Sequence, residues 1–356
     1  MTGLASLAEC RSEPAPGSPA GIEYSIARLL DRRDLSRLEA EALFAEIVAG
    51  RLPESLMAAA FVALRFKGET ADELAGAALA LRSAARPFAA PDYPFADSCG
   101  TGGDCSGSIN VSTAAGLVAA ACGLPVVKHG NRSFTSKCGS ADVLEALGAK
   151  LDVSPPASRR ILDDTGFCFL LATFYHPGIA HAGPVRRALR VRTVMNLLGP
   201  CLNPARPPVQ LLGVPDPALL MPIAETLREL GVERALIVHG SGLDEVAVHA
   251  VTQAVRLSGG ELETLEITPE QAGLKRYDKQ SVAGGDPAHN AQLLIDLLSG
   301  RGSEAHRAIV ALNCGALLET AGIASDLREG VERSLDALAS GRAKRLLEAF
   351  VEASRG

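Results

Sequence analysis

Four runs of apolar residues at helical spacing occupy residues 22–86. In each run the apolar positions recur three and four residues apart, as on one face of a helix that packs on a core. Gly50 and Gly68 each follow a run, and Thr70 and Glu73 have the spacing of a capping box. The pattern predicts a small all-helical subdomain, with helices at residues 22–31, 34–50, 53–68 and 70–85.

From Phe95 onward the pattern changes to short apolar runs that alternate with helical segments. Alternating strands and helices are typical of an α/β domain with a mainly parallel central sheet and flanking helices. The predicted strands are PVVK (125–128), KLDV (150–153), FCFLLA (167–172), VQLLGV (209–214) and RALIVHG (234–240).

One stretch interrupts this alternation. HPGIAHAGPVRRALRVRTVMNLLGP (176–200) has the pattern of successive helical segments, so we expect the chain to return here to the helical subdomain. The predicted organisation is an N-terminal tail (1–21), the helical subdomain (22–92), a first part of the α/β domain (93–174), a return segment (175–206) and a second part of the α/β domain (207–356).

Two glycine-rich polar turns, CGTGGD (99–104) and KHGNR (128–132), stand on either side of an alanine-rich helix pattern. A helix that starts just after a glycine-rich turn offers unpaired N–H donors and a positive dipole end, which together favour anions. The cations Lys128 and Arg132 suit phosphate groups. The turn is not a Walker A loop, because GK[ST] is absent, and it lacks the GxGxxG spacing of dinucleotide folds.

Composition excludes several classes. The net charge of −6 gives no basic footprint for nucleic acid, and no apolar run is long enough to cross a membrane. The first residues lack the basic and apolar regions of a secretory signal. Eight cysteines without a CxxC fit reduced thiols better than a disulfide framework. We therefore expect a cytoplasmic protein that binds neither nucleic acid nor membranes.

The joint pattern DSCGTGGD…NVST…KHGNRS…GSADVLEALG resembles the signature of the anthranilate phosphoribosyltransferases, within the nucleoside phosphorylase/phosphoribosyltransferase family. The resemblance continues through YHPGIAHAGPVRRALRVRTVMNLLGPCLNPA, GLDEV and LNCGALLETAG, and so covers nearly the whole chain beyond the tail. It implies transfer of the phosphoribosyl group of 5-phosphoribosyl 1-pyrophosphate (PRPP) to anthranilate in tryptophan biosynthesis. It also implies a homodimer and a cleft between the subdomains.

The resemblance carries site residues over position by position. The implied PRPP-binding positions are Gly100, Thr101, Gly102, Gly103, Asp104, Ser108, Asn110, Val111, Ser112, Thr113, Lys128, His129, Gly130, Asn131, Arg132 and Ser140. The implied anthranilate-binding positions are Gly100, His129, Asn131, His176 and Arg186, and the implied ligands of Mg2+, two ions per site, are Ser112, Asp244 and Glu245. No catalytic acid, base or nucleophile is expected, because an arylamine is already unprotonated at neutral pH.

Ordinary structural roles compete with these assignments. An adjacent Asp-Glu pair is usually solvated, PVRRALRVR alone indicates a basic helix face, and a histidine before proline is most often a turn residue. In GGDPAHNA we expect Asp286 to cap a helix that begins at Pro287, without a catalytic role. We also expect the thiols beside the two turns, Cys99, Cys105 and Cys138, to be inert.

The chain departs from the family pattern mainly on the acceptor side. Gly178, Ile179 and Ala180 stand where Ala, Met and Lys are frequent, and Arg190 stands where glycine is common. Phe134, Thr135 and Cys138 vary a loop usually rich in serine. The departures leave open a transferase for another aromatic amine. A pyrimidine-nucleoside phosphorylase or a nucleic-acid-binding paralogue agrees less well with the motifs and the acidic charge.

Overall fold

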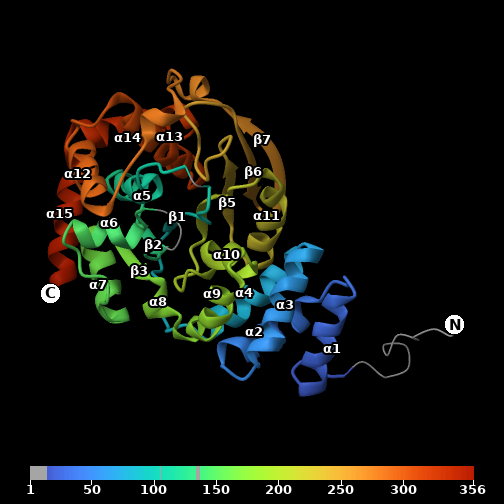
Figure 1. The fold of residues 1–356 in the computed structure, drawn as a ribbon. Helices are drawn as coiled ribbons and strands as arrows, with labels where there is room; N and C mark the ends of the chain where they lie inside the picture. Colours follow the sequence, from blue (N-terminus) through green and yellow to red (C-terminus); the bar gives the residue numbers. More distant parts are fainter. Residues whose placement is uncertain (1–13, 105, 134–136) are drawn as a thin grey trace. The chain divides into compact units, whose positions relative to one another are not determined.

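The computed structural model describes residues 14–104, 106–133 and 137–356 (Figure 1). The chain divides into two compact units. The first contains the residues up to Ala84 and the segment Gly178–Met195, and the second contains Ala85–Pro177 and Asn196–Gly356. Within the described residues, no helix is long and apolar enough to cross a membrane.

The first unit is helical, as predicted. Its helices are α1 (Pro19–Leu30), α2 (Arg37–Val48), α3 (Glu54–Lys67), α4 (Ala71–Ser83) and α9 (Gly183–Leu189), with the 3-10 helix η1 (Pro177–Ala182) at its border. The capping box at the start of α4 is confirmed, because Thr70 accepts from the Glu73 N–H and Glu73 accepts from the Thr70 N–H. Leu43, Phe44 and Phe61 are buried within this unit, and the ring centroids of Phe44 and Phe61 lie 6.3 Å apart.

Two departures from the family pattern have a visible structural setting in this unit. Gly178 packs against the end of α2, where an added Cβ would lie 2.6 Å from the Val48 carbonyl oxygen. Arg190 ends α9 in the left-handed conformation, at φ 52° and ψ 27°. The backbone at Arg190 therefore keeps the conformation that glycine adopts most easily.

The second unit is built on a seven-stranded sheet in the order β3-β2-β1-β4-β5-β6-β7. The five strands from β3 to β5 are parallel, and β6 and β7 add an antiparallel edge, so the mainly parallel sheet is confirmed. The strands are β1 (Ala96–Gly100), β2 (Val126–Gly130), β3 (Phe167–Leu171), β4 (Val209–Gly213), β5 (Arg234–His239), β6 (Thr252–Ser258) and β7 (Glu261–Ile267).

The strand predicted at residues 150–153 is wrong. The Lys150 N–H donates to the Ser354 hydroxyl at 3.0 Å rather than to a neighbouring strand. Strands β1, β6 and β7 were not predicted. β1 is short and runs into the glycine-rich turn, and most residues of β7 are exposed, so neither has a strong apolar run.

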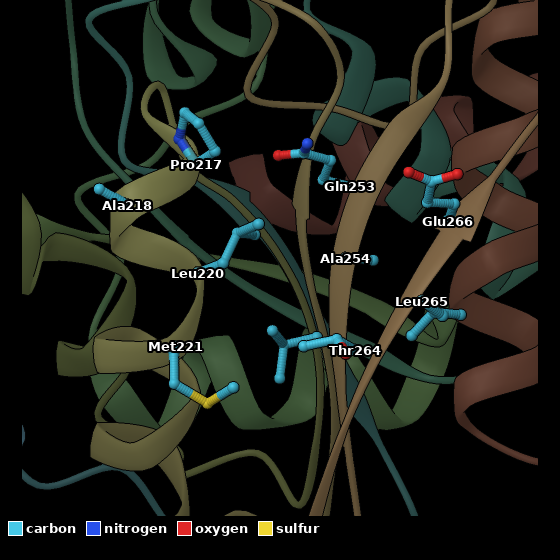
Figure 2. Close-up of a pocket in the computed structure, with 10 residues that line it drawn as sticks. Pro217, Ala218, Leu220, Met221, Gln253, Ala254, Thr264, Leu265 and Glu266 are labelled. Carbon is cyan, nitrogen blue, oxygen red and sulfur yellow. The ribbon is translucent and has the colours of Figure 1, made fainter.

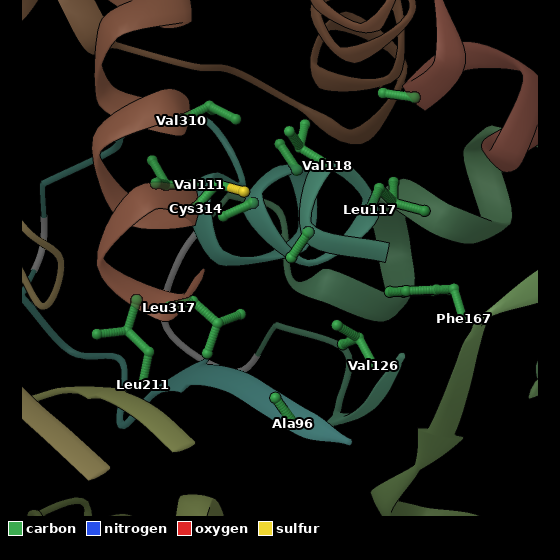
Figure 3. Packing of buried hydrophobic residues seen from close by; sticks show 14 of the residues in the cluster. Ala96, Val111, Leu117, Val118, Val126, Phe167, Leu211, Val310, Cys314 and Leu317 are labelled. Carbon is green, nitrogen blue, oxygen red and sulfur yellow. The ribbon is translucent and has the colours of Figure 1, made fainter. Parts of the chain in front are cut away.

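Helix α5 (Val111–Ala121) lies at the centre of the core of this unit. Figure 3 shows Val111, Leu117 and Val118 of α5 among residues of the sheet and of α13 (Glu304–Thr320). The other elements of this unit are α6 (Ser140–Ala146), α7 (Pro155–Thr165), α8 (Ala172–Tyr175), η2 (Gly199–Leu202), η3 (Pro217–Leu219), α11 (Leu220–Glu229), η4 (Pro269–Ala272), η5 (Lys279–Val282), α12 (Pro287–Leu298), α14 (Leu327–Ala339) and α15 (Arg342–Arg355). Helix α10 (Val194–Leu198) spans the border between the units.

Candidate active site

The glycine-rich turn after β1 lies against the acidic loop after β5. Because β1 and β5 both flank β4 in the parallel part of the sheet, their carboxyl ends meet at one edge. The Gly102 N–H donates to Asp244 Oδ2 at 2.8 Å. A Cβ on Gly100 would lie 2.4 Å from the same oxygen, so only glycine allows this approach. On the other side, the Asp244 N–H donates to Asp104 Oδ2 at 3.4 Å.

Glu245 connects the acidic loop to the start of α5. Its Oε1 accepts the Ser112 N–H at 3.2 Å, one of the donors that a helix N-terminus leaves unpaired. The next residue, Val246, is held on both sides by the buried side chain of Asn313 in α13. The Val246 N–H donates to Asn313 Oδ1 at 2.8 Å, and Asn313 Nδ2 donates to the Val246 carbonyl at 2.9 Å.

Burial is the largest influence on the pKa of both acidic groups. Burial, and then the neighbouring Asp104, raise the pKa of Asp244 to about 7. Burial and the Asp244 carboxylate raise the pKa of Glu245 well above its ordinary range, against the opposing effect of Lys128. A bound cation would favour the ionised form of both groups.

The protein supplies few metal ligands of its own here. In the part of the chain that the structure describes, no three His, Cys, Asp or Glu side chains form a metal-binding cluster. An ion beside Asp244 and Glu245 would therefore need further ligands from a substrate or water, as Mg2+ usually does.

Lys128 lies beneath the turn with 2% of its surface exposed. Its Nζ donates to the Ser98 carbonyl and, at 3.1 Å, to the Ser112 hydroxyl. Asp97 is fully buried near this cation, and burial raises its pKa to about 6 against the opposing effects of Lys128 and Asn203. Asn203 Nδ2 donates to Asp97 Oδ2 at 2.9 Å. The site thus has a positive group supported from below by a buried polar network.

The stretch before α5 is held by a distant segment. The Ile109 N–H donates to the Val282 carbonyl, and the Gly284 N–H donates to the Gly107 carbonyl. Ser108 forms an isolated antiparallel bridge with Ala283. Asn110 follows as the residue before α5, with Val111 and Thr113 buried in the first turn.

His129 and His176 are brought together within the second unit. Both are buried, and their rings pack edge to face with centroids 5.2 Å apart. Asn131 is exposed after β2, and a Cβ on the adjacent Gly130 would lie 2.3 Å from the Ser140 hydroxyl. Arg132, predicted as a phosphate cation, forms an exposed ion pair with Glu145 at 2.5 Å.

Arg186 belongs to the first unit, on α9, and its burial lowers the pKa of its guanidinium.

Among the thiols, burial raises the pKa of Cys99 well above its ordinary range and that of Cys138 to about 11, so neither is an acidic thiol. Cys105, Phe134 and Thr135 lie outside the described residues.

Pattern analysis missed the amides that support this site: Asn203, Asn290 and Asn313. All three are at most 1% exposed. The sequence signal for such a residue is a lone asparagine in an apolar helix, as in LNCGALL. Because a buried amide must be hydrogen-bonded, an asparagine at such a position indicates a structural role.

A separate cavity of about 780 Å3 lies between α11 and the antiparallel edge (Figure 2). Leu220 and Met221 border it on one side, with Gln253 of β6 and Thr264 of β7 on the other. None of the predicted site residues lines it.

Comparisons with known proteins agree with this geometry. Residues 92–344 match the model of the glycosyl transferase family, a/b domain, and residues 24–85 match its helical bundle domain. The anthranilate phosphoribosyltransferase of Sorangium cellulosum is 57% identical over 90% of this chain and 92% of its own length. That of Pectobacterium atrosepticum is 50% identical over 90% of each chain.

Solved structures give the same result. The anthranilate phosphoribosyltransferase of Thermus thermophilus superposes with a TM-score of 0.89 at 42% identity, covering 93% of this chain and 99% of the other. The Saccharomyces cerevisiae enzyme, solved in complex with PRPP and Mg, superposes with a TM-score of 0.87 at 27% identity, covering 96% and 99%. The chain therefore belongs to the anthranilate phosphoribosyltransferase family.

Proposed function

We propose that this protein transfers the phosphoribosyl group of PRPP to the amine of anthranilate, giving N-(5-phosphoribosyl)anthranilate and pyrophosphate in tryptophan biosynthesis. The proposal depends mainly on one observation: the glycine-rich turn, the start of α5 and the acidic loop after β5 meet at one place. The glycine-rich turn and the start of α5 each donate a backbone N–H to the acidic pair, through Gly102 to Asp244 and Ser112 to Glu245. The relatives of this chain share both the fold and the name of this activity.

The donor side requires groups that hold a heavily charged leaving group. We assign it to the turn Gly100–Asp104, to Ser108 and Asn110, to the first turn of α5 and to the Lys128–Arg132 and Ser140 positions. Backbone N–H groups at a helix start bind phosphate without side-chain charge. The buried Lys128 adds a cation whose position is fixed by Ser98 and Ser112. As pyrophosphate departs, these fixed groups stabilise its charge without reorganising.

Ser112, Asp244 and Glu245 fit a magnesium site, because they offer one hydroxyl and two carboxylates as hard oxygen ligands. The yeast relative was solved in complex with PRPP and Mg, which supports magnesium, and we propose two ions per site on the family resemblance. When bound, magnesium supplies charge neutralisation to the pyrophosphate group. Asn313 contributes by holding the backbone at Val246, next to the two carboxylates.

We assign the acceptor to Gly100, His129, Asn131, His176 and Arg186. The planar guanidinium of Arg186 suits the anthranilate carboxylate, since its fork can bind two oxygens. The acceptor nitrogen is unprotonated at neutral pH, so positioning rather than proton abstraction brings about the reaction. A homodimer in the cytoplasm is the expected form of the enzyme.

The direct test follows the fluorescence of anthranilate when PRPP and Mg2+ are added to the pure protein. Consumption that requires all three components would establish donor, acceptor and metal together. If PRPP binds by calorimetry but anthranilate is not consumed, the acceptor is another aromatic amine. If PRPP does not bind and thymidine or uridine is cleaved by phosphate, the protein is a nucleoside phosphorylase and the proposal is wrong.

The metal assignment is tested by Asp244→Asn combined with Glu245→Gln. We expect turnover to fall at least about 100-fold, because fixed charge around the leaving group is lost. The matched control is Glu263→Gln with Glu266→Gln on the exposed edge strand β7. An unchanged magnesium dependence in the first variant would contradict the assignment.

A further inference from the structure

The segment GGDPAHNA is more than a helix start. Asp286 does cap α12, and its side chain accepts the His289 N–H at 2.9 Å. One turn later, Asn290 is buried, with 1% of its surface exposed. Its side chain does not continue the cap but points toward the residue that precedes α5.

Two amides form a chain whose direction is fixed at one end. Asn290 Oδ1 accepts the backbone N–H of Gly285 at 2.7 Å. A backbone N–H can only donate, so the group of Asn290 that meets it must be the oxygen. Asn290 Nδ2 must then be the group on the other side, and it donates to Asn110 Oδ1 at 2.9 Å.

The same logic fixes Asn110. With its oxygen directed at Asn290, its Nδ2 is directed away, and it donates to the Cys138 carbonyl at 3.2 Å. Cys138 stands just before the start of α6 at Ser140, another predicted donor-site position. A reversed Asn110 would set its oxygen against the Cys138 carbonyl, which places two acceptors face to face.

The surrounding backbone holds this arrangement in place. The strand-like pairing of residues 282–284 with residues 107–109 fixes the distance between the two amides. A Cβ on Gly284 would lie 2.6 Å from Asn290 Oδ1, so a larger residue at position 284 would displace the amide.

We propose that Asn290 is a positioning residue for the donor substrate: it holds Asn110 Oδ1 on its own side, so that the second hydrogen of Asn110 Nδ2, the one not donated to the Cys138 carbonyl, is left for the phosphate-bearing substrate. This inference rests on the proposed function, because it assumes that Asn110 contacts PRPP. An anion is bound by donors and repelled by the lone pairs of a carbonyl oxygen. Loss of Asn290 therefore weakens donor binding without removing any group that touches the substrate.

The variant Asn290→Leu tests this, since leucine has nearly the shape of asparagine but no polar atoms. We expect the dissociation constant for PRPP with Mg2+, measured by calorimetry, to rise about 10- to 100-fold, the effect of one hydrogen bond to a charged group. The KM for anthranilate at saturating PRPP should change less than about threefold. The matched control is Gln292→Leu, which removes an exposed amide from the same helix.

A double-mutant cycle separates orientation from general damage. In an Asn110→Ala background, adding Asn290→Leu should change PRPP affinity less than about twofold, because there is no amide left to orient. A full further loss in that background, or wild-type affinity in a folded Asn290→Leu, would overturn the inference. If a thermal melt shows that Asn290→Leu does not fold, Asn290→Ala, which leaves room for water, takes its place.

The two levels of the proposal fail differently. If the proposed function is wrong, the wild type itself fails to bind PRPP or to consume anthranilate. If only the role of Asn290 is wrong, the wild type behaves as proposed and the cycle shows independent effects.

Discussion

Individual residues in this protein matter most where they are buried and polar. Three such residues lie beneath the proposed donor side: Asp97, Lys128 and Asn203. All are almost without exposure, and each has a neighbour that offsets its burial. Such groups are stable only when their hydrogen bonds and charges are matched. Their removal therefore changes stability and site geometry together.

The raised pKa of Asp97 predicts how the free energy of unfolding depends on pH. The native state binds a proton at this group up to about pH 6, while the unfolded chain loses it near pH 4. The native state thus holds more protons in this window, so the free energy of unfolding falls as pH rises through it. Asp97→Asn should remove this contribution, which is about 3 kcal/mol.

The measurement is urea unfolding of wild type and Asp97→Asn at several pH values between about 4.5 and 7.5, with EDTA present. The stability of the wild type relative to the variant should decrease as pH rises, and then level off. A constant difference across the range would show that Asp97 does not titrate in this window.

Arg190 makes the second prediction at this scale. A residue with a Cβ in the left-handed conformation is strained by about 1–2 kcal/mol, and glycine is not. Arg190→Gly should therefore raise the free energy of unfolding by about 0.5–1 kcal/mol, the relief of strain that remains after the greater entropy of glycine in the unfolded chain is subtracted. Arg187→Gly, inside the same helix, should lower it by about 1 kcal/mol. Thermal melts of both variants check the two signs.

At the scale of elements, two helices carry the site and are packed in opposite ways. Helix α5 is rich in alanine and lies on the sheet with space beside Gly116, where a Cβ would be 3.4 Å from the nearest atom, Val126 Cγ1. Helix α13 meets α14 at Gly315 and Gly330, where the two backbones touch. Helix α13 also carries Asn313, which is hydrogen-bonded to the backbone of Val246 next to the acidic pair. The close contact of α13 with α14 therefore also helps to position the acidic loop.

The two glycines predict opposite responses to the same substitution. At Gly315 an added Cβ would lie 2.7 Å from the Val331 nitrogen, so Gly315→Ala should destabilise by about 1–3 kcal/mol. At Gly116 the contact is an ordinary one, so Gly116→Ala should stabilise by about 0.5–1 kcal/mol through helix propensity. Denaturant unfolding of both variants is the measurement. Equal effects would mean that packing does not distinguish the sites.

At the scale of the whole molecule, the chain enters the helical unit twice. The described donor-side residues all lie in the second unit, whereas Arg186 comes from the segment Gly178–Met195 of the first. The departures Gly178, Ile179, Ala180 and Arg190 lie in the same segment. Among the proposed acceptor positions only Arg186 lies in the first unit, so we expect a division in which loss of Arg186 weakens acceptor binding and spares the donor.

Arg186→Ala tests that division. We expect the KM for anthranilate to rise about 10- to 100-fold, the effect of losing one charged hydrogen-bonding partner, while the dissociation constant for PRPP stays within about twofold. Arg187→Ala, at the exposed neighbouring position, is the matched control. Equal losses for both substrates would contradict the assignment of Arg186 to the acceptor.

Periodicity predicted most elements because a buried face of a helix or strand requires apolar residues at regular spacing in the sequence. The helices of the first unit and strands β2 to β5 all have one. β1 and β7 were missed because a short strand that runs into a turn, or a largely exposed strand, does not have apolar residues at regular spacing. Residues 150–153 were wrongly assigned, since four residues of suitable composition do not show whether a partner strand is near.

For the site, the motif residues could be named from the sequence, because glycine-rich turns and the acidic pair recur in a fixed order along the chain. Their partners could not. The bonds from Gly102 to Asp244 and from Asn290 to Asn110 join residues 142 and 180 positions apart. The sequence alone determined the family and most of the elements, because periodicity and motifs are local. Only the tertiary structure decided which amide faces which group, because hydrogen-bond direction depends on neighbours that folding brings together.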